Sequence, residues 1–209
     1  MSIPSLDDAW AKIYEPGAPG VKFRLETLQL AKEAGIPIYA AIAPTYPECD
    51  AADLEATLKA VAQLDPVCIY HEPINIRAEN VKRIQANAKE LGKSLKTEVF
   101  ESPESWRRYA MEQLFMVQSL AEKLGIIDRL KLWPDAGLET KSHFLSILKE
   151  DSQRDEAADE ILYQHHVEWL QGWWKKLAAW PGVPPQPGWA VPPIPTDSPF
   201  TTPLLDTVK

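Results

Sequence analysis

The spacing of apolar residues in the first half of the chain predicts strands that alternate with helices. Ile36–Ala43 is an almost continuous apolar run of strand length, and Pro66–Tyr70 is a second, shorter run. Such runs are typical of parallel strands buried on both faces. Helical spacing precedes, separates and follows them, in Val21–Ala34, Ala51–Leu64 and Arg77–Leu91. This order, with its short links, predicts parallel strands joined by right-handed crossovers.

Local signals mark the ends of several predicted elements. Gly35 and Gly92 each follow a helical stretch, a position where glycine commonly ends a helix. Ser5 is followed by acidic residues, which predicts that it caps the N-terminus of a helix. Before it, the short apolar segment Met1–Ile3 resembles the last residues of a strand.

The second half of the chain is predicted to be mainly helical. We expect a third short strand at Leu95–Phe100 and a long helix at Ser102–Leu124, opened by a serine cap and a proline. Arg129–Asp135 is again strand-like, and Leu138–Lys149 and Ile161–Trp180 have helical spacing.

The domain organisation follows from these elements. Residues 1–100 form the β/α part, residues 101–180 a helical extension, and residues 181–209 a proline-rich tail. Because prolines recur every few residues in that tail, we expect it to be extended and loosely held.

Composition limits the classes of protein that fit. The 209 residues are 45% hydrophobic, enough for one sizeable core. A net charge of −8 argues against general binding to nucleic-acid phosphates, although a local basic groove stays open. No apolar run approaches the roughly 18 residues that cross a membrane. Two cysteines without a CxxC pair, and no signal peptide, indicate a reducing cytoplasm and no membrane partner.

The first candidate site follows the first predicted strand. In parallel β/α proteins, ligands bind beyond the carboxyl ends of the strands. There the segment Ala43–Pro47 carries two prolines, Pro44 and Pro47, which fix the backbone. One interpretation is a rigid loop that presents carbonyl groups and Tyr46 to a flat ligand. The alternative is an ordinary strand-to-helix turn.

The second candidate site is His71–Arg77, after the second predicted strand. It brings together an imidazole, the Glu72 carboxylate, the Asn75 carboxamide and the Arg77 guanidinium. These groups can bind a polar ligand, or His71 and Glu72 can move a proton. Alternatively, Glu72 pairs with Arg77 and Asn75 caps the following helix.

Two further groups of residues carry side chains that can bind a ligand or a metal ion. Trp133 and Asp135 place an aromatic ring and an acid at a strand end, as in a substrate site; the alternative is a core tryptophan beside a turn aspartate. His165 and His166 are adjacent on a helix, so their side chains point about 100° apart. We therefore expect no metal site there.

The order of short motifs resembles the second half of radical S-adenosylmethionine (SAM) proteins of the spore photoproduct lyase-like group. The motifs are Ser2–Asp8, Tyr14–Pro19, Arg24–Glu26, Ala34–Pro37 and Ala43–Pro47. Each is short, so the resemblance depends on their order and spacing over residues 2–92.

The resemblance implies a partial (β/α) barrel with a helical C-terminal extension. SAM would lie across the strand ends beside a [4Fe–4S] cluster. The implied cofactor-binding residues follow the fourth, fifth and sixth barrel strands: Ser2 and Ser5, then Ala43, Pro44 and Thr45, then His71, Glu72 and Asn75. The implied substrate-binding residues are Tyr46, Arg77, Trp133 and Asp135. No catalytic residue is assigned.

The chain departs from the family at the cluster. Such proteins hold it with three thiolates of a CxxxCxxC loop, whereas this chain has only Cys49 and Cys68, and lacks the first three strands. We therefore expect a truncated fragment that cannot hold the cluster and is inactive alone. With its edges and interior exposed, it would be marginally stable, or associate with itself or a missing N-terminal half.

Other functions stay open. A nucleic-acid substrate follows only by analogy with the photoproduct lyase. A stand-alone binding module on a β/α scaffold, or a small β/α enzyme that uses Glu72 and His71 as acid and base, are the alternatives.

Overall fold

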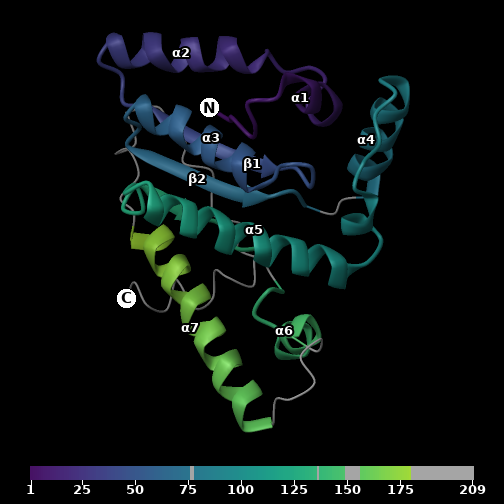
Figure 1. Cartoon of the computed structure of the whole chain (residues 1–209). Coiled ribbons are helices and arrows are strands. Elements are labelled where there is room, and N and C mark those ends of the chain that lie inside the picture. Colours follow the sequence, from purple (N-terminus) through teal and green to yellow (C-terminus); the bar gives the residue numbers. More distant parts are fainter. Residues whose placement is uncertain (76–77, 136, 149–155, 180–209) are drawn as a thin grey trace, which may run out of the picture. The chain divides into compact units, whose positions relative to one another are not determined.

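The chain divides into two compact units. The computed structural model describes residues 1–75, 78–135, 137–148 and 156–179 (Figure 1). The first unit is Met1–Leu132, and the second begins at Trp133.

The first unit is built on a small parallel sheet. Its strands are β1 (Tyr39–Thr45), β2 (Cys68–Pro73) and β3 (Leu130–Leu132), in the order β1-β2-β3. Both pairs of neighbours are parallel, which confirms the predicted parallel pairing. Ser2 adds a parallel bridge to Ala41 on the other side of β1, so Met1–Ile3 does lie beside the sheet. The sheet is open among the described residues.

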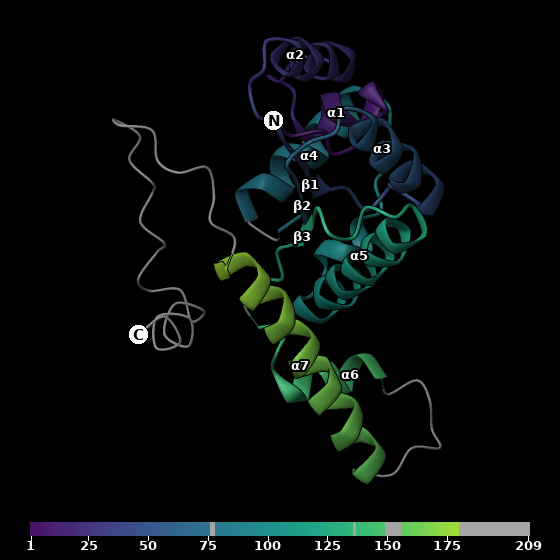
Figure 2. The same ribbon diagram turned by 90° about the vertical axis from the view of Figure 1, so that its left-hand side faces the viewer.

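Two helices cover one face of this sheet. The helical segments of the unit are α1 (Asp8–Tyr14), α2 (Val21–Glu33), α3 (Ala51–Gln63), α4 (Ala78–Glu90), the 3-10 helix η1 (Thr97–Phe100) and α5 (Pro103–Lys123). α3 packs on β1, and α5 packs on β2, β3 and α3; both lie on the same side of the strands in Figure 2. The first unit therefore extends past residue 100, because α5 covers the sheet.

The side chains of the strands alternate between two faces. The covered face, beneath α3 and α5, carries almost fully buried residues in matching register: Ala40, Ile42, Ile69, His71, Leu130 and Leu132. The open face carries half-buried residues: Tyr39, Ala41, Ala43, Tyr70, Glu72 and Lys131, with Cys68 fully buried among them. The expectation that the strands are buried on both faces is thus wrong for the open face.

Several predicted element ends are confirmed. Gly35 and Gly92 follow α2 and α4 with φ of 74° and 64°, the left-handed region that glycine adopts without strain. At the start of α5, the Ser102 hydroxyl accepts a hydrogen bond from the Ser105 amide at 3.0 Å.

Two predicted elements are wrong. Asp7, not Ser5, caps α1, because its carboxylate accepts from the Ala9 amide at 2.7 Å. The Ser5 hydroxyl accepts from the amide of Asp7 itself, two residues before the position that Asp7 caps. Leu95–Phe100 forms no strand: Thr97–Phe100 is the 3-10 helix η1. The position beside β2 is taken by β3, which follows α5.

The second unit contains α6 (Lys141–Leu148) and α7 (Glu156–Ala179). The His166 ring stacks on Phe144 with centroids 4.4 Å apart, and its Nε2 lies 2.7 Å from the Leu138 carbonyl oxygen. The predicted helices are confirmed with shifted ends, and the tail 181–209 lies outside the described residues. No helix among the described residues is long and apolar enough to cross a membrane.

Candidate functional site

The two predicted strand ends lie next to each other. In the ladder, Ile42 pairs with His71 and Thr45 with Pro73. Between these two pairs, β1 has two residues where β2 has one. This irregularity brings the Thr45 side chain onto the covered face, as a β-bulge does. There Thr45 Oγ1 lies 2.7 Å from His71 Nε2. The ends of the two predicted strands therefore lie side by side.

The backbone at the strand ends is already bonded within the protein. The Tyr109 hydroxyl donates to the Thr45 carbonyl oxygen and the Trp106 indole donates to that of Ile74, each at 2.7 Å. The Ser2 hydroxyl donates to the Ala43 carbonyl oxygen. The carbonyl groups of Ala43 and Thr45, which we expected to face a ligand, therefore accept hydrogen bonds from within the protein.

His71 and Glu72 lie on opposite faces of the sheet. His71 is fully buried on the covered face, and this burial lowers its pKa to about 3, so the imidazole is neutral near pH 7. Its Nδ1 is buried with no hydrogen-bond partner among the described residues. Glu72 is half-buried on the open face. The two groups are not placed to act on one ligand as acid and base.

Tyr46 is a core residue. Its ring stacks on Tyr14 with centroids 4.1 Å apart and planes 8° apart, and its hydroxyl donates to Glu15 at 3.1 Å. Burial, and then the Glu15 charge, raise the pKa of Tyr46 well above its ordinary value. The expectation that this ring faces a flat substrate does not fit its complete burial.

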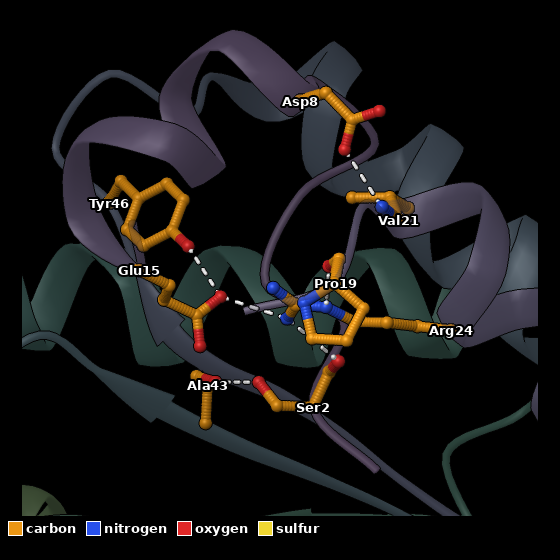
Figure 3. Close-up of polar contacts among 8 residues, drawn as sticks. All are labelled: Ser2, Asp8, Glu15, Pro19, Val21, Arg24, Ala43 and Tyr46. Carbon is orange, nitrogen blue, oxygen red and sulfur yellow. Dashed lines mark hydrogen bonds and ion pairs between the residues drawn. The ribbon is translucent and has the colours of Figure 1, made fainter. Parts of the chain in front are cut away.

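An ion pair between buried Arg24 and half-buried Glu15 joins separate sequence motifs (Figure 3). Arg24 is 5% exposed, and its Nη1 lies 2.9 Å from the Glu15 carboxylate, which also accepts from Tyr46. Arg24 also donates to the carbonyl oxygens of Pro19 at 2.7 Å and Ser2 at 3.2 Å. Residues from four of the five motifs therefore meet in one polar cluster.

Sequence reasoning used Glu15 and Arg24 only as parts of motifs and missed their pairing. A signal was present in the spacing of α2. Val21, Arg24 and Leu28 recur at i, i+3 and i+7, and all three are buried. An arginine on the buried face of a helix needs an acidic or carbonyl partner nearby.

Ser5 is buried with a structural role. Its hydroxyl lies 3.4 Å from the Asp53 carboxylate and accepts from the Asp7 amide, so it connects α1 with α3. The neighbouring Cys49 thiol is also buried, which raises its pKa to about 12. This thiol stays protonated and is not a ready metal ligand.

The expected cofactor-binding residues thus divide by face and burial. Ser5, Thr45 and His71 are buried. Ser2, Ala43, Pro44, Glu72 and Asn75 are half-buried near the ends of the first segment, β1 and β2. Of the expected substrate-binding residues, Arg77 lies outside the described residues, while Trp133, 52% exposed, and Asp135 belong to the second unit.

The open face also carries residues that sequence reasoning missed. These are Tyr39, Tyr70 and Lys131, which project there around Cys68. Burial raises the pKa of Cys68 and that of Tyr70. The alternation of side chains along a strand was the available signal, because residues next to the buried ones must point to the other face of the sheet. Neither this group nor any other in the described part of the chain gathers three histidine, cysteine or acidic residues that could hold a metal ion.

Comparison with known proteins gives one similarity. No model of a protein family matches this chain. No solved structure matches it. The chain is similar to an uncharacterized protein, ORF301, of Acidianus two-tailed virus: 34% identical over 91 residues, which are 41% of this chain and 30% of the viral protein. The chain thus matches less than a third of the length of that relative.

Proposed function

We propose that the first unit is part of a larger (β/α) barrel of the radical SAM type, in the spore photoproduct lyase-like group. In this proposal the open face belongs to the interior of the barrel and contributes part of the pocket for SAM and substrate. In this proposal the chain alone is inactive, because its described residues do not complete the barrel.

The observation that carries the proposal is the one-sided cover of the parallel sheet. Parallel sheets are normally buried on both faces. Here α3 and α5 pack on one face, while polar side chains such as Tyr70, Glu72 and Lys131 are half-buried on the other. In a (β/α) barrel, helices cover the outer face of the strands, the other face points to the interior, and ligands bind at the carboxyl ends of the strands.

The residues present fit the two implied cofactors differently. Glu72 and Asn75 offer polar groups for SAM beside Ala43 and Pro44 on the half-buried side. A [4Fe–4S] cluster does not fit, because it needs three thiolates, whereas the chain has two cysteines and both are buried. No step of a reaction is therefore assigned to this chain.

A stand-alone binding module is the second candidate. The strand ends are held by internal hydrogen bonds from Tyr109, Trp106 and Ser2, so their conformation does not need a ligand. A small enzyme with His71 and Glu72 as base and acid is not supported, because these side chains lie on opposite faces of the sheet.

Chemical-shift mapping by NMR tests the proposal at millimolar SAM, where weak binding is detectable. We expect shifts at Ala43–Thr45 and Glu72–Asn75, and none in α2. Glu72→Gln should weaken the response several-fold, whereas Lys131→Met, a matched change on the same face away from the strand ends, should not. Absence of shifts at both strand ends would contradict the proposal.

Anaerobic reconstitution with iron and sulfide tests the cluster separately. We expect no stoichiometric [4Fe–4S] absorption from the isolated chain. A full complement of cluster on this chain would show that the thiolate argument is wrong.

A further inference from the structure

Two buried polar atoms, one on β2 and one on α5, have no hydrogen-bond partner among the residues that the structure describes. They are His71 Nδ1, on the covered face of β2, and Gln113 Oε1, on α5. His71 is fully buried and Gln113 is 5% exposed. Because a buried polar atom without a partner costs free energy, such atoms are usually bonded to protein groups or to an internal water molecule.

The two side chains lie at the same level of the contact between α5 and β2. The Trp106 indole donates to the Ile74 carbonyl oxygen, just after the end of β2. Gln113 follows Trp106 by two helical turns on the same side of α5, which is about 10 Å along the helix axis. His71 precedes Ile74 by three residues, which is also about 10 Å along the strand direction. Because β3 follows α5 and is parallel to β2, α5 runs against β2, so the two displacements point the same way.

Tyr109 places Gln113 near His71 by a second route. Tyr109 lies one turn before Gln113 on the same side of α5, and its hydroxyl donates to the Thr45 carbonyl oxygen at 2.7 Å. The side chain of Thr45 in turn holds the imidazole, with Oγ1 2.7 Å from His71 Nε2. Within α5, Gln113 Oε1 is the buried side-chain acceptor that has no partner in the described part of the chain. It is therefore the group of α5 that is available to His71 Nδ1.

We propose that His71 Nδ1 and Gln113 Oε1 bind one internal water molecule between them. No direct hydrogen bond joins the two atoms. The water donates one hydrogen to Gln113 Oε1, and it uses its other hydrogen or its oxygen for His71 Nδ1, so it satisfies either tautomer of the neutral ring. Two polar partners are enough to hold a buried water.

This water connects α5 to the end of β1. The connection runs from Gln113 through the water to His71, and from His71 Nε2 to the Thr45 side chain. The strand end is then held by α5 twice, because Tyr109 also bonds to the Thr45 backbone. This inference does not depend on the radical SAM proposal.

Magnetic relaxation dispersion of water deuterons tests the site, because it counts long-lived internal water molecules. Gln113→Met keeps the length of the side chain and removes the acceptor, so we expect this variant to hold one such water fewer than the wild type. Gln118→Met is the matched control on α5, because Gln118 is half-buried and bonds to Glu122 at 2.9 Å. It should keep the wild-type count. Equal counts for Gln113→Met and the wild type would overturn the proposal.

Gln113→Glu separates loss of the water from a failure to fold. This variant keeps an oxygen acceptor, so it should keep the wild-type count with an unchanged circular dichroism spectrum. A crystal structure of the wild-type chain tests the same site directly. We expect one peak of solvent density within hydrogen-bond distance of both His71 Nδ1 and Gln113 Oε1. A folded Gln113→Glu variant without the water, or a crystal structure in which the two side chains bond directly, would overturn the proposal.

Discussion

The two faces of the sheet in the first unit differ in how their polar groups are used. On the covered face, His71 and Thr45 bond to each other, and Tyr109 bonds to the Thr45 backbone, all out of contact with water. On the open face, Glu72 and Lys131 remain half-buried. Neighbouring residues such as His71 and Glu72 therefore have unrelated roles, and the residue types of one loop do not by themselves define a site.

The largest expected difference between the faces is in how the free energy of unfolding depends on pH. The pKa of buried His71 is lowered from its ordinary value to about 3, so the unfolded chain binds more protons between pH 6.5 and 3. Stability from His71 is complete above pH 6.5 and is lost as the pH falls, by about 1.4 kcal/mol per pH unit.

Urea unfolding between pH 7 and 4 measures this slope. His71→Gln keeps a polar side chain towards Thr45 but does not titrate, so its free energy of unfolding should fall less steeply. Identical slopes for the two proteins would mean that His71 does not titrate as its burial implies.

Truncation on the covered face should come next in size. Leu132 is fully buried beneath α5, so Leu132→Ala should lower the free energy of unfolding by about 3 kcal/mol through lost burial and a cavity. Lys131→Ala, one residue away on the open face, should change it by less than about 0.5 kcal/mol. Comparable losses in urea unfolding would show that both faces are packed.

A smaller effect is expected at the strand end. Tyr109→Phe removes the hydroxyl that donates to the buried Thr45 carbonyl oxygen and leaves the Ile74 amide, at 3.1 Å, as the remaining donor to it, so we expect a cost of about 1 kcal/mol. Thermal unfolding measures the loss, and Phe115→Leu on the more exposed side of α5 serves as a comparison. An unchanged melting temperature for Tyr109→Phe would mean that the hydrogen bond from the Ile74 amide is enough for this oxygen.

The smallest effect on stability is expected for Glu72→Gln on the open face. Because Glu72 is half-buried, removing its charge should change the free energy of unfolding by less than about 0.5 kcal/mol. A loss above about 2 kcal/mol in urea unfolding would instead place Glu72 among the residues that hold the fold.

Local patterns predicted much of this fold. Apolar runs located β1 and β2, and glycines at 35 and 92 located two helix ends, because these signals depend on neighbouring residues only. The contact between Thr45 and His71 was not predicted, because it depends on the irregular register between β1 and β2. The bulge, the choice of covered face and the burial of Tyr46 did not follow, since they depend on α5 and α1, which are distant in sequence.

The contact between Arg24 and Ser2 has a consequence for the edge of the sheet. Met1 and Ile3 bond to Ala41, so the Ser2 carbonyl points to the outer side of the segment. Exposed edge groups are templates for pairing with other chains and for aggregation. The Arg24 guanidinium donates to this carbonyl from inside the protein. Any strand added at this edge has to share that oxygen with Arg24, so this arginine protects the edge against unspecific pairing.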